Sequence, residues 1–186
     1  MFINQFQNVG RALFSRGLVS SSSGNLSIRM GEHLIITRRG SNLATLEEID
    51  LVETGIHKND RNTPLASVEL PVHRAIYQNT QAKAIVHAHP PHLTALSMVD
   101  RVIKSEHLEN FGSIAVVPVL GWDMEVKPGG LADIIAETLK TNYIIAVRGH
   151  GSFAIGQIMD EAYDYTTNLE AACQILCLLK SMRVSG

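Results

Sequence analysis

Residues 82–90 read Ala-Lys-Ala-Ile-Val-His-Ala-His-Pro, a short apolar run that carries two histidines and ends at a proline. The run predicts a buried strand over 82–88 that Pro90 brings to a stop. Successive side chains of a strand point to opposite faces, so His87 and His89 share a face, with Cα atoms about 6.5–7 Å apart. Two imidazoles at that spacing can bind one metal ion, although the pair also suits two histidines on a solvated strand face.

Two further positions strengthen the case for a metal site. His150 lies in the stretch 148–151, Arg-Gly-His-Gly, which predicts a tight turn between apolar strands with the imidazole pointing outward. Glu69 opens a predicted helix over 67–79, one turn before His73 on the same face. A carboxylate near a metal can act as ligand or general base. Each has a plainer alternative, His150 as a turn residue and Glu69 as a favourable charge at a helix N-terminus.

Outward from these motifs, helices and strands alternate, but neighbouring strands are often joined by tight turns. Residues 25–30 and 33–38 predict a hairpin, and 143–147 with 153–157 flank the turn at His150. We therefore expect an α/β (or α+β) fold, in which a largely antiparallel central β-sheet is covered by helices on both faces. The other expected elements are helices over 2–16, 67–79, 92–99, 130–140 and 160–183, a short helix opening at Thr45, and strands over 51–56, 82–88 and 114–120.

The composition is that of an ordinary globular protein, with 45% apolar and 18% charged residues in 186. This length, without repeats or a linker, predicts a single domain over 1–186. A formal net charge of −2 gives no basic excess of the kind that favours nucleic acid or anionic membranes. Two cysteines exclude a disulfide scaffold or a Cys-rich zinc module. With neither a long apolar run nor a signal-peptide pattern, we expect a cytoplasmic protein with no membrane partner.

Taken together, the motifs resemble the class II sugar-phosphate aldolase family, whose members include L-fuculose-1-phosphate aldolase and whose superfamily includes the adducin head domain. The resemblance runs from about residue 10 to 182. Its motifs occur in family order, at 23–29, 36–40, 67–69 with His73, 85–90 and 148–151. The resemblance implies that His87, His89 and His150 are zinc ligands. It also implies that Glu69 is the catalytic glutamate and contacts the metal in the resting site.

The resemblance to this family also implies a cofactor, a reaction and an oligomeric state. The resemblance implies one Zn²⁺ per subunit, with another divalent metal as the alternative. It implies a lyase that cleaves a small ketose 1-phosphate to dihydroxyacetone phosphate and an aldehyde through a metal-bound enediolate. It further implies a homotetramer with active sites at subunit interfaces. A dehydratase, epimerase or decarboxylase of the same fold is the alternative, and a non-catalytic adducin-like interaction domain is a third interpretation, one that has no need of the metal residues.

The family's phosphate pocket is built from three loops. Its matching positions here are Gly24, Asn25, Gly40 and Ser67. Where aldolases usually carry Thr-Gly, this chain has Arg39 before Gly40, and where they carry Ser-Ser-Glu it has Val68 in the middle. Val68 removes a hydroxyl donor, whereas Arg39 adds a cation that can bind phosphate or carboxylate through two hydrogen bonds, unless it points to solvent.

Fuculose-phosphate aldolase carries a tyrosine near residues 104–110 that reaches a neighbouring subunit's site as a proton donor, and this chain has none there. Glu106 or His107 could take its place, with a solvated charged loop as the alternative. His73 is a candidate for orienting Glu69 or the metal shell. His92 is expected to pack or to support the site, rather than to bind the metal.

Overall fold

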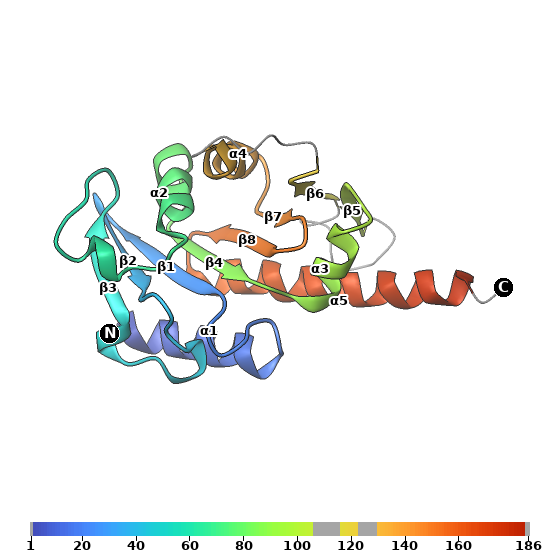
Figure 1. The fold of residues 1–186 in the computed structure, drawn as a ribbon, viewed down its shortest axis with the longest axis horizontal. Helices are drawn as coiled ribbons and strands as arrows, with labels where there is room; N and C mark the ends of the chain where they lie inside the picture. Colours follow the sequence, from blue (N-terminus) through green and yellow to red (C-terminus); the bar gives the residue numbers. More distant parts are fainter. Residues whose placement is uncertain (1, 106–115, 123–129, 185–186) are drawn as a thin grey trace.

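One mixed sheet organises the molecule in the computed structural model, which describes residues 2–105, 116–122 and 130–184 (Figure 1). Its strands are β1 (Asn25–Met30), β2 (His33–Thr37), β3 (Leu51–Gly55), β4 (Ala84–Ala88), β5 (Val102–Lys104), β6 (Val116–Leu120), β7 (Ile144–Val147) and β8 (Gly151–Gly156). They lie in the order β3-β2-β1-β4-β8-β7-β6-β5. Only the β6–β7 pair is parallel among them, so the expected antiparallel sheet is confirmed.

Helices cover both faces of this sheet, as expected (Figure 1). The helices α1 (Phe2–Ser15), α3 (Pro91–Ser97) and α5 (Met159–Val184) contribute to one apolar core. The helices α2 (Leu70–Asn79) and α4 (Gly130–Thr138) cover the other face and contribute to a second core. None of the described helices combines the length and apolar character that a membrane crossing requires.

Strand β4 lies near the middle of the sheet and is buried along its whole length. Val86 contributes to the core beneath α1 and α5, whereas Ile85 contributes to the core beneath α2 and α4. His87 follows Ile85 by two residues and therefore shares its face. There its ring stacks on Phe153 of β8, with ring centroids 4.1 Å apart. A strand covered on both sides is typically a continuous apolar run, which is why the histidines stand out in it.

The structure differs from the expectation at a few elements. The short helix expected to open at Thr45 is wrong: two 3₁₀ turns lie there, Leu43–Thr45 and Glu48–Asp50. The second is held by Asp50 Oδ2, which accepts from the backbone N–H of Glu47 at 2.9 Å. Strand β5 was not expected, and β8 begins two residues earlier than the sequence indicated. The first residues of the strand expected over 114–120 lie outside the described part of the chain.

Candidate metal centre

His87 is held by the strand next to its own. It is 1% exposed, and its Nδ1 lies 2.8 Å from the backbone oxygen of Ser152 on β8. A carbonyl oxygen can only accept, so Nδ1 carries the proton of the neutral ring. The lone pair is therefore on Nε2, the nitrogen that faces the His89 ring and is available to bind a metal.

His89 follows directly where β4 ends. Its backbone N–H donates to the oxygen of Leu18 at 2.8 Å, and the chain then turns into α3 at Pro91. The two histidines were expected to share a face, and their rings do converge: Nε2 of His89 lies 2.9 Å from Nε2 of His87.

His150 is brought to the same place by the β7–β8 hairpin. Gly149 adopts a φ of +65° in the hairpin loop, a region that favours glycine, and its N–H donates to Ser97 Oγ at 2.9 Å. Gly151 allows the hairpin to approach β4, since a Cβ atom there would lie only 2.2 Å from the oxygen of Ala88. Both glycines around His150 are thus required by the backbone geometry.

Replacing Gly151 by alanine is therefore expected to push the hairpin away from β4. The free energy of unfolding should fall by about 1–3 kcal/mol, the usual cost of overpacking. Metal affinity should fall at least about 10-fold, because His150 moves with the hairpin. Gly17→Ala is the control, since Gly17 has a φ of +69° but nothing within 4 Å of a new Cβ atom. Urea unfolding and metal titration check this; a Gly151→Ala protein that binds metal as tightly as Gly17→Ala would contradict it.

The three imidazoles form one cluster. Their ligand atoms all lie within 4.8 Å of one another, and the Nε2 atoms of His87 and His89 are 2.9 Å apart. Two ligands bonded to one zinc ion at about 2.0–2.1 Å in tetrahedral geometry lie about 3.3 Å apart. The observed separations bracket that value, and nitrogen donors suit zinc and several other divalent transition metals. The residues present therefore fit a metal ion of this kind.

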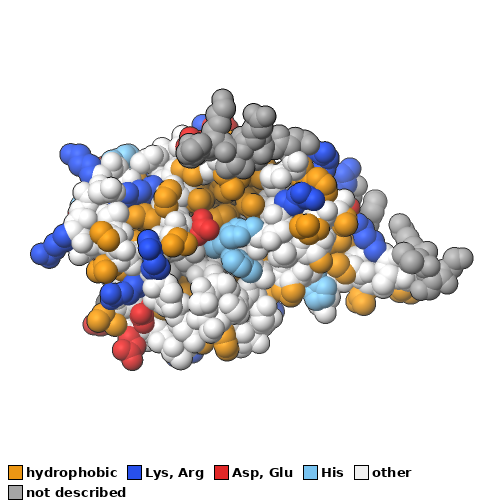
Figure 2. Space-filling view, in the orientation of Figure 1, with side chains coloured by type: hydrophobic (Ala, Val, Ile, Leu, Met, Phe, Trp, Pro, Cys, Tyr) orange, Lys and Arg blue, Asp and Glu red, His pale blue; other side chains and the backbone are white. Residues whose placement is uncertain are grey.

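Glu69 lies at the edge of this cluster, at the N-cap position of α2. Its backbone N–H donates to Ser67 Oγ at 3.3 Å, so the loop before the helix fixes its position. The carboxylate Oε1 lies 3.5 Å from Nε2 of His150. Side chains of histidine and acidic residues accordingly meet near the centre of one face of the molecule (Figure 2).

The pKa values favour a metal-binding state. A hydrogen bond from His150 lowers the pKa of the Glu69 carboxyl below its ordinary value, while burial opposes the shift. Burial holds the pKa of His87 well below its usual range, and burial together with the His150 charge also lowers the pKa of His89. At neutral pH the carboxylate is therefore ionised while these two rings are neutral, as metal ligation requires.

The residues expected in the phosphate pocket divide into two groups. Asn25 is 5% exposed and pairs directly with His87 in the β1–β4 ladder, and Gly24 precedes it at a φ of +77°. Ser67 lies beside Glu69 through the hydrogen bond already described. Gly40 is exposed at a φ of +75°, so the turn that carries it is open to solvent.

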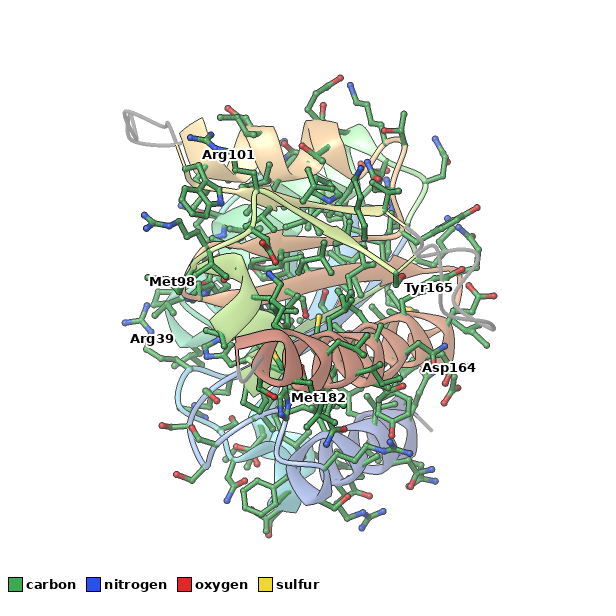
Figure 3. All side chains as sticks on the ribbon, turned by 90° about the vertical axis from the view of Figure 1, so that its right-hand side faces the viewer. Arg39, Met98, Arg101, Asp164, Tyr165 and Met182 are labelled. Atoms are coloured by element: carbon green, nitrogen blue, oxygen red, sulfur yellow. The ribbon has the colours of Figure 1, made fainter. Side chains whose placement is uncertain are left out.

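Arg39 is also exposed, and its backbone N–H donates to the oxygen of Leu65 at 3.0 Å. Its guanidinium has no hydrogen-bond or ion-pair partner among the residues that the structure describes. It lies on the same side of the molecule as Met98 (Figure 3), whose sulfur lies 2.8 Å from where a Cβ atom of Gly149 would be. Arg39 therefore faces the side of the metal cluster without forming part of it.

His73 and His92 have partners other than the expected ones. The His73 ring contacts Asn25 and Ser27, and no hydrogen bond to the Glu69 carboxylate is found among the described residues; its expected role in orienting Glu69 or the metal shell stays a prediction. His92 Nδ1 lies 2.7 Å from Glu170 on α5, consistent with the packing expected. Glu106 and His107, the candidate proton donors, lie outside the described residues.

Some contributors to the site have no sequence motif. Phe153 stacks on His87, the Ser152 carbonyl fixes the tautomer of that ring, and Ser97 holds the hairpin loop. Each acts through a contact between distant segments: the β4–β8 register places Phe153 and Ser152 beside β4, and Ser97 joins α3 to the hairpin loop. A separate hollow of about 410 Å³ lies at the opposite end of these strands, around Ala82 and Gly156, and includes no expected site residue.

The same fold occurs in known proteins. The sequence profile of the class II aldolase and adducin N-terminal domain matches residues 4–177. The chain belongs to this family. Its fold is that of the crystal structure of L-fuculose-1-phosphate aldolase from Thermus thermophilus, with a TM-score of 0.90 and 35% identity over 98% of this chain and 97% of that one.

Its curated class II aldolase relatives carry different activities in their names. L-fuculose phosphate aldolase of Methanococcus maripaludis is 32% identical over 187 residues, covering 98% of this chain and 100% of that protein. 3-Oxo-tetronate 4-phosphate decarboxylase of Haemophilus influenzae is 28% identical, covering 95% and 87%. A probable bifunctional methylthioribose-1-phosphate isomerase/methylthioribulose-1-phosphate dehydratase of Nocardia farcinica is 30% identical over 89% of this chain, which spans only 33% of that protein.

Proposed function

We propose that the protein is a metal-dependent lyase that cleaves a small ketose 1-phosphate to dihydroxyacetone phosphate and an aldehyde. The observation that carries the proposal is the convergence of three imidazoles whose ligand atoms lie within 4.8 Å, with the Glu69 carboxylate 3.5 Å from one of them. His87, His89, His150 and Glu69 would hold the ion. Zinc is the metal that this donor set favours, and another divalent ion is the alternative.

A divalent ion bound there supplies a Lewis acid that stabilises negative charge on a substrate oxygen. The residues of the chain handle the proton. When the carbon–carbon bond breaks, the hydroxyl on the departing carbon loses its proton and becomes the aldehyde carbonyl, while the electron pair of the bond moves towards the ketone carbonyl; the carbon next to that carbonyl then gains a proton, so no net proton is consumed. Glu69, in its protonated form, gives that carbon a proton; in the direction of synthesis, the ionised carboxylate removes it. The lowered pKa of Glu69 suits the second role, because the carboxylate is ionised at neutral pH.

The substrate phosphate would be held on the Glu69 side of the cluster. Asn25, Gly24 and Ser67 offer an amide, a close backbone approach and a hydroxyl, all adjacent to His87 or Glu69 in the structure. Gly40 and Arg39 come from the neighbouring loop, which is tied to Ser67 by the N–H of Ser67 donating to Thr37 at 3.1 Å. The exposed Arg39 side chain would swing to bind an anionic group of the substrate, phosphate or carboxylate.

A homotetramer with active sites at subunit interfaces accompanies this proposal. The supporting observation is the openness of the cluster in a single chain, where the His150 side chain is 39% and the Glu69 side chain 24% exposed. Apolar side chains are exposed near its rim, Val68 at 64% and Met98 at 48%, and a neighbouring subunit would cover them. Light scattering should give four times the chain mass of 20.4 kDa, and a monomeric mass would contradict the proposal.

Decarboxylation or dehydration of a related sugar phosphate is the second candidate. Relatives named for both reactions are about as similar to this chain as those named for aldol cleavage. Two residues also favour a substrate that differs from that of the usual aldolases, since Val68 provides no hydroxyl donor and Arg39 provides a cation that suits a carboxylate. A non-catalytic interaction domain has no need of the clustered imidazoles and carboxylate, which argues against it.

The decisive experiment is a substrate screen with zinc present. We expect aldehyde release from at least one ketose 1-phosphate, at a rate lost on chelation and restored by zinc. Arg39→Thr, which brings back the family's usual residue, should alter KM more than kcat, because Arg39 lies away from the reacting centre. Turnover of hydroxy-carboxylates or oxo-acids alone, with every phosphorylated ketose inert, would overturn the aldolase assignment in favour of the second candidate.

A further inference from the structure

A buried chain of polar side chains lies behind the metal cluster, beneath α2. Tyr77 OH lies 2.8 Å from Ser27 Oγ, and Ser27 Oγ lies 2.6 Å from Nδ1 of His73. The other ring nitrogen of His73, Nε2, lies 2.6 Å from Oδ1 of Asn25. Ser27 and His73 are fully buried and Tyr77 is 1% exposed. A fully connected polar chain of this kind in a protein interior holds its members in one arrangement.

The Asn25 amide oxygen, at the end of this series, determines which atom donates in each of its hydrogen bonds. The amide oxygen of Asn25 can only accept, so Nε2 of His73 carries the proton and donates. Nδ1 of the neutral ring then has a lone pair and accepts from the Ser27 hydroxyl. The Ser27 oxygen in turn accepts from the Tyr77 hydroxyl, so that each proton is directed towards Asn25.

The Asn25 end of this series of hydrogen bonds lies next to the metal cluster. With its oxygen turned to His73, Asn25 directs its amide nitrogen the other way, and this nitrogen has no hydrogen-bond partner among the described residues. In the described part of the chain, the side-chain polar atoms that are both buried and without a partner are Trp122 Nε1 and Ser152 Oγ. The Asn25 nitrogen is not one of them, so it is in contact with solvent. The small exposed part of Asn25, 5%, therefore includes this nitrogen. Asn25 pairs with His87 across the β1–β4 ladder, so the free N–H groups lie next to a proposed metal ligand.

We propose that the Tyr77–Ser27–His73 chain is a positioning device that locks the Asn25 amide with its N–H groups facing the metal cluster, where they donate to a negatively charged oxygen of the substrate. This inference deepens the proposed function and rests on it for the identity of the ligand. An unrestrained asparagine could equally turn its oxygen towards the site, where it would repel such an oxygen. His73 makes that orientation unfavourable, because Nε2–H would then face the NH₂ group.

The first test needs no activity. Nitrogen-15 labelling of the histidines in the full-length protein, with two-bond correlation spectra, identifies which ring nitrogen of His73 is protonated. We expect Nε2–H. A His73 ring protonated at Nδ1 would reverse every hydrogen bond in the chain and overturn the proposal, whether or not the protein cleaves any ketose.

The second test is a double-mutant cycle on the holoenzyme. His73→Phe should lower kcat/KM by about 10- to 100-fold, the usual effect of losing a residue that orients a site. His73→Gln keeps an N–H donor for Asn25 and should recover much of that loss. In an Asn25→Ala background, His73→Phe should have no further effect, because His73 acts only through Asn25. Metal content of each variant confirms that the cluster is intact.

Asn25→Asp completes the design, since the carboxylate still accepts from His73 but presents an oxygen to the substrate. We expect a larger loss of kcat/KM than for Asn25→Ala. Additive effects in the cycle, or a rate in His73→Phe equal to wild type with metal bound, would show that the chain is only structural. A wild-type protein that cleaves no ketose phosphate, yet has His73 protonated at Nε2, would count against the proposed function and leave the locked amide supported.

Discussion

The His87→Ala protein is expected to bind no stoichiometric metal and to lose at least about 10³-fold in turnover. His87 is 1% exposed, and Ser152 fixes its tautomer so that Nε2 presents its lone pair to the cluster. The ligands that remain, His89, His150 and Glu69, are all partly exposed, so the substitution removes the one buried ligand and the only one whose ring is fixed by the neighbouring strand. Loss of the Lewis acid removes several kcal/mol of stabilisation from the charged transition state.

Two controls separate metal loss from unfolding. His57→Ala removes a half-exposed histidine whose described ion-pair partner is Glu32 at 3.6 Å, away from the cluster, and should leave metal content unchanged. Chelation of the wild-type protein followed by return of zinc should remove and restore turnover without any substitution. Metal content by atomic absorption and near-ultraviolet circular dichroism follow both. A folded His87→Ala protein with one bound metal per chain and wild-type turnover would eliminate the proposed metal centre.

The sequence predicted the site best where the local backbone conformation, a strand or a tight turn, determines how the side chains are placed. Alternation along β4 places His87 and His89 on one face, and their Nε2 atoms do converge to 2.9 Å. The glycines beside His150 predicted a tight turn, and both are needed, Gly149 for its positive φ and Gly151 for its closeness to Ala88. Both motifs depend on local backbone geometry, and this is why the sequence was enough to predict them.

Contacts between residues far apart in the sequence could not be predicted from the sequence patterns. The expectation that His73 orients Glu69 or the metal shell came from helix periodicity, which does place His73 and Glu69 one turn apart. That period says nothing of β1, which runs beneath α2 and offers His73 the two partners it actually contacts, Ser27 and Asn25. The expected short helix at Thr45 failed for a related reason, because the Asp50 side chain closes a tighter 3₁₀ turn on Glu47.

The substitution Glu69→Gln separates proton transfer from metal binding. Glutamine has the size of glutamate and still offers an oxygen towards His150, so metal content should stay close to wild type. It cannot take or give the proton at the carbon beside the carbonyl, so turnover should fall by about 10²–10⁴-fold, the usual contribution of a general acid–base group. The measurement is steady-state release of aldehyde together with metal analysis of the same sample.

Glu53→Gln serves as the matched control, because Glu53 is an exposed carboxylate on β3, and it should keep wild-type turnover. A second readout distinguishes a missing proton carrier from a displaced substrate. If Glu69 acts on the substrate carbon, exchange of the hydrogen of dihydroxyacetone phosphate with deuterated water should stop in Glu69→Gln, whereas binding of that compound should persist. Continued exchange at the wild-type rate would assign the proton to another group and leave Glu69 with a role in holding the metal alone, because an amide oxygen can still contact the ion but cannot carry the proton.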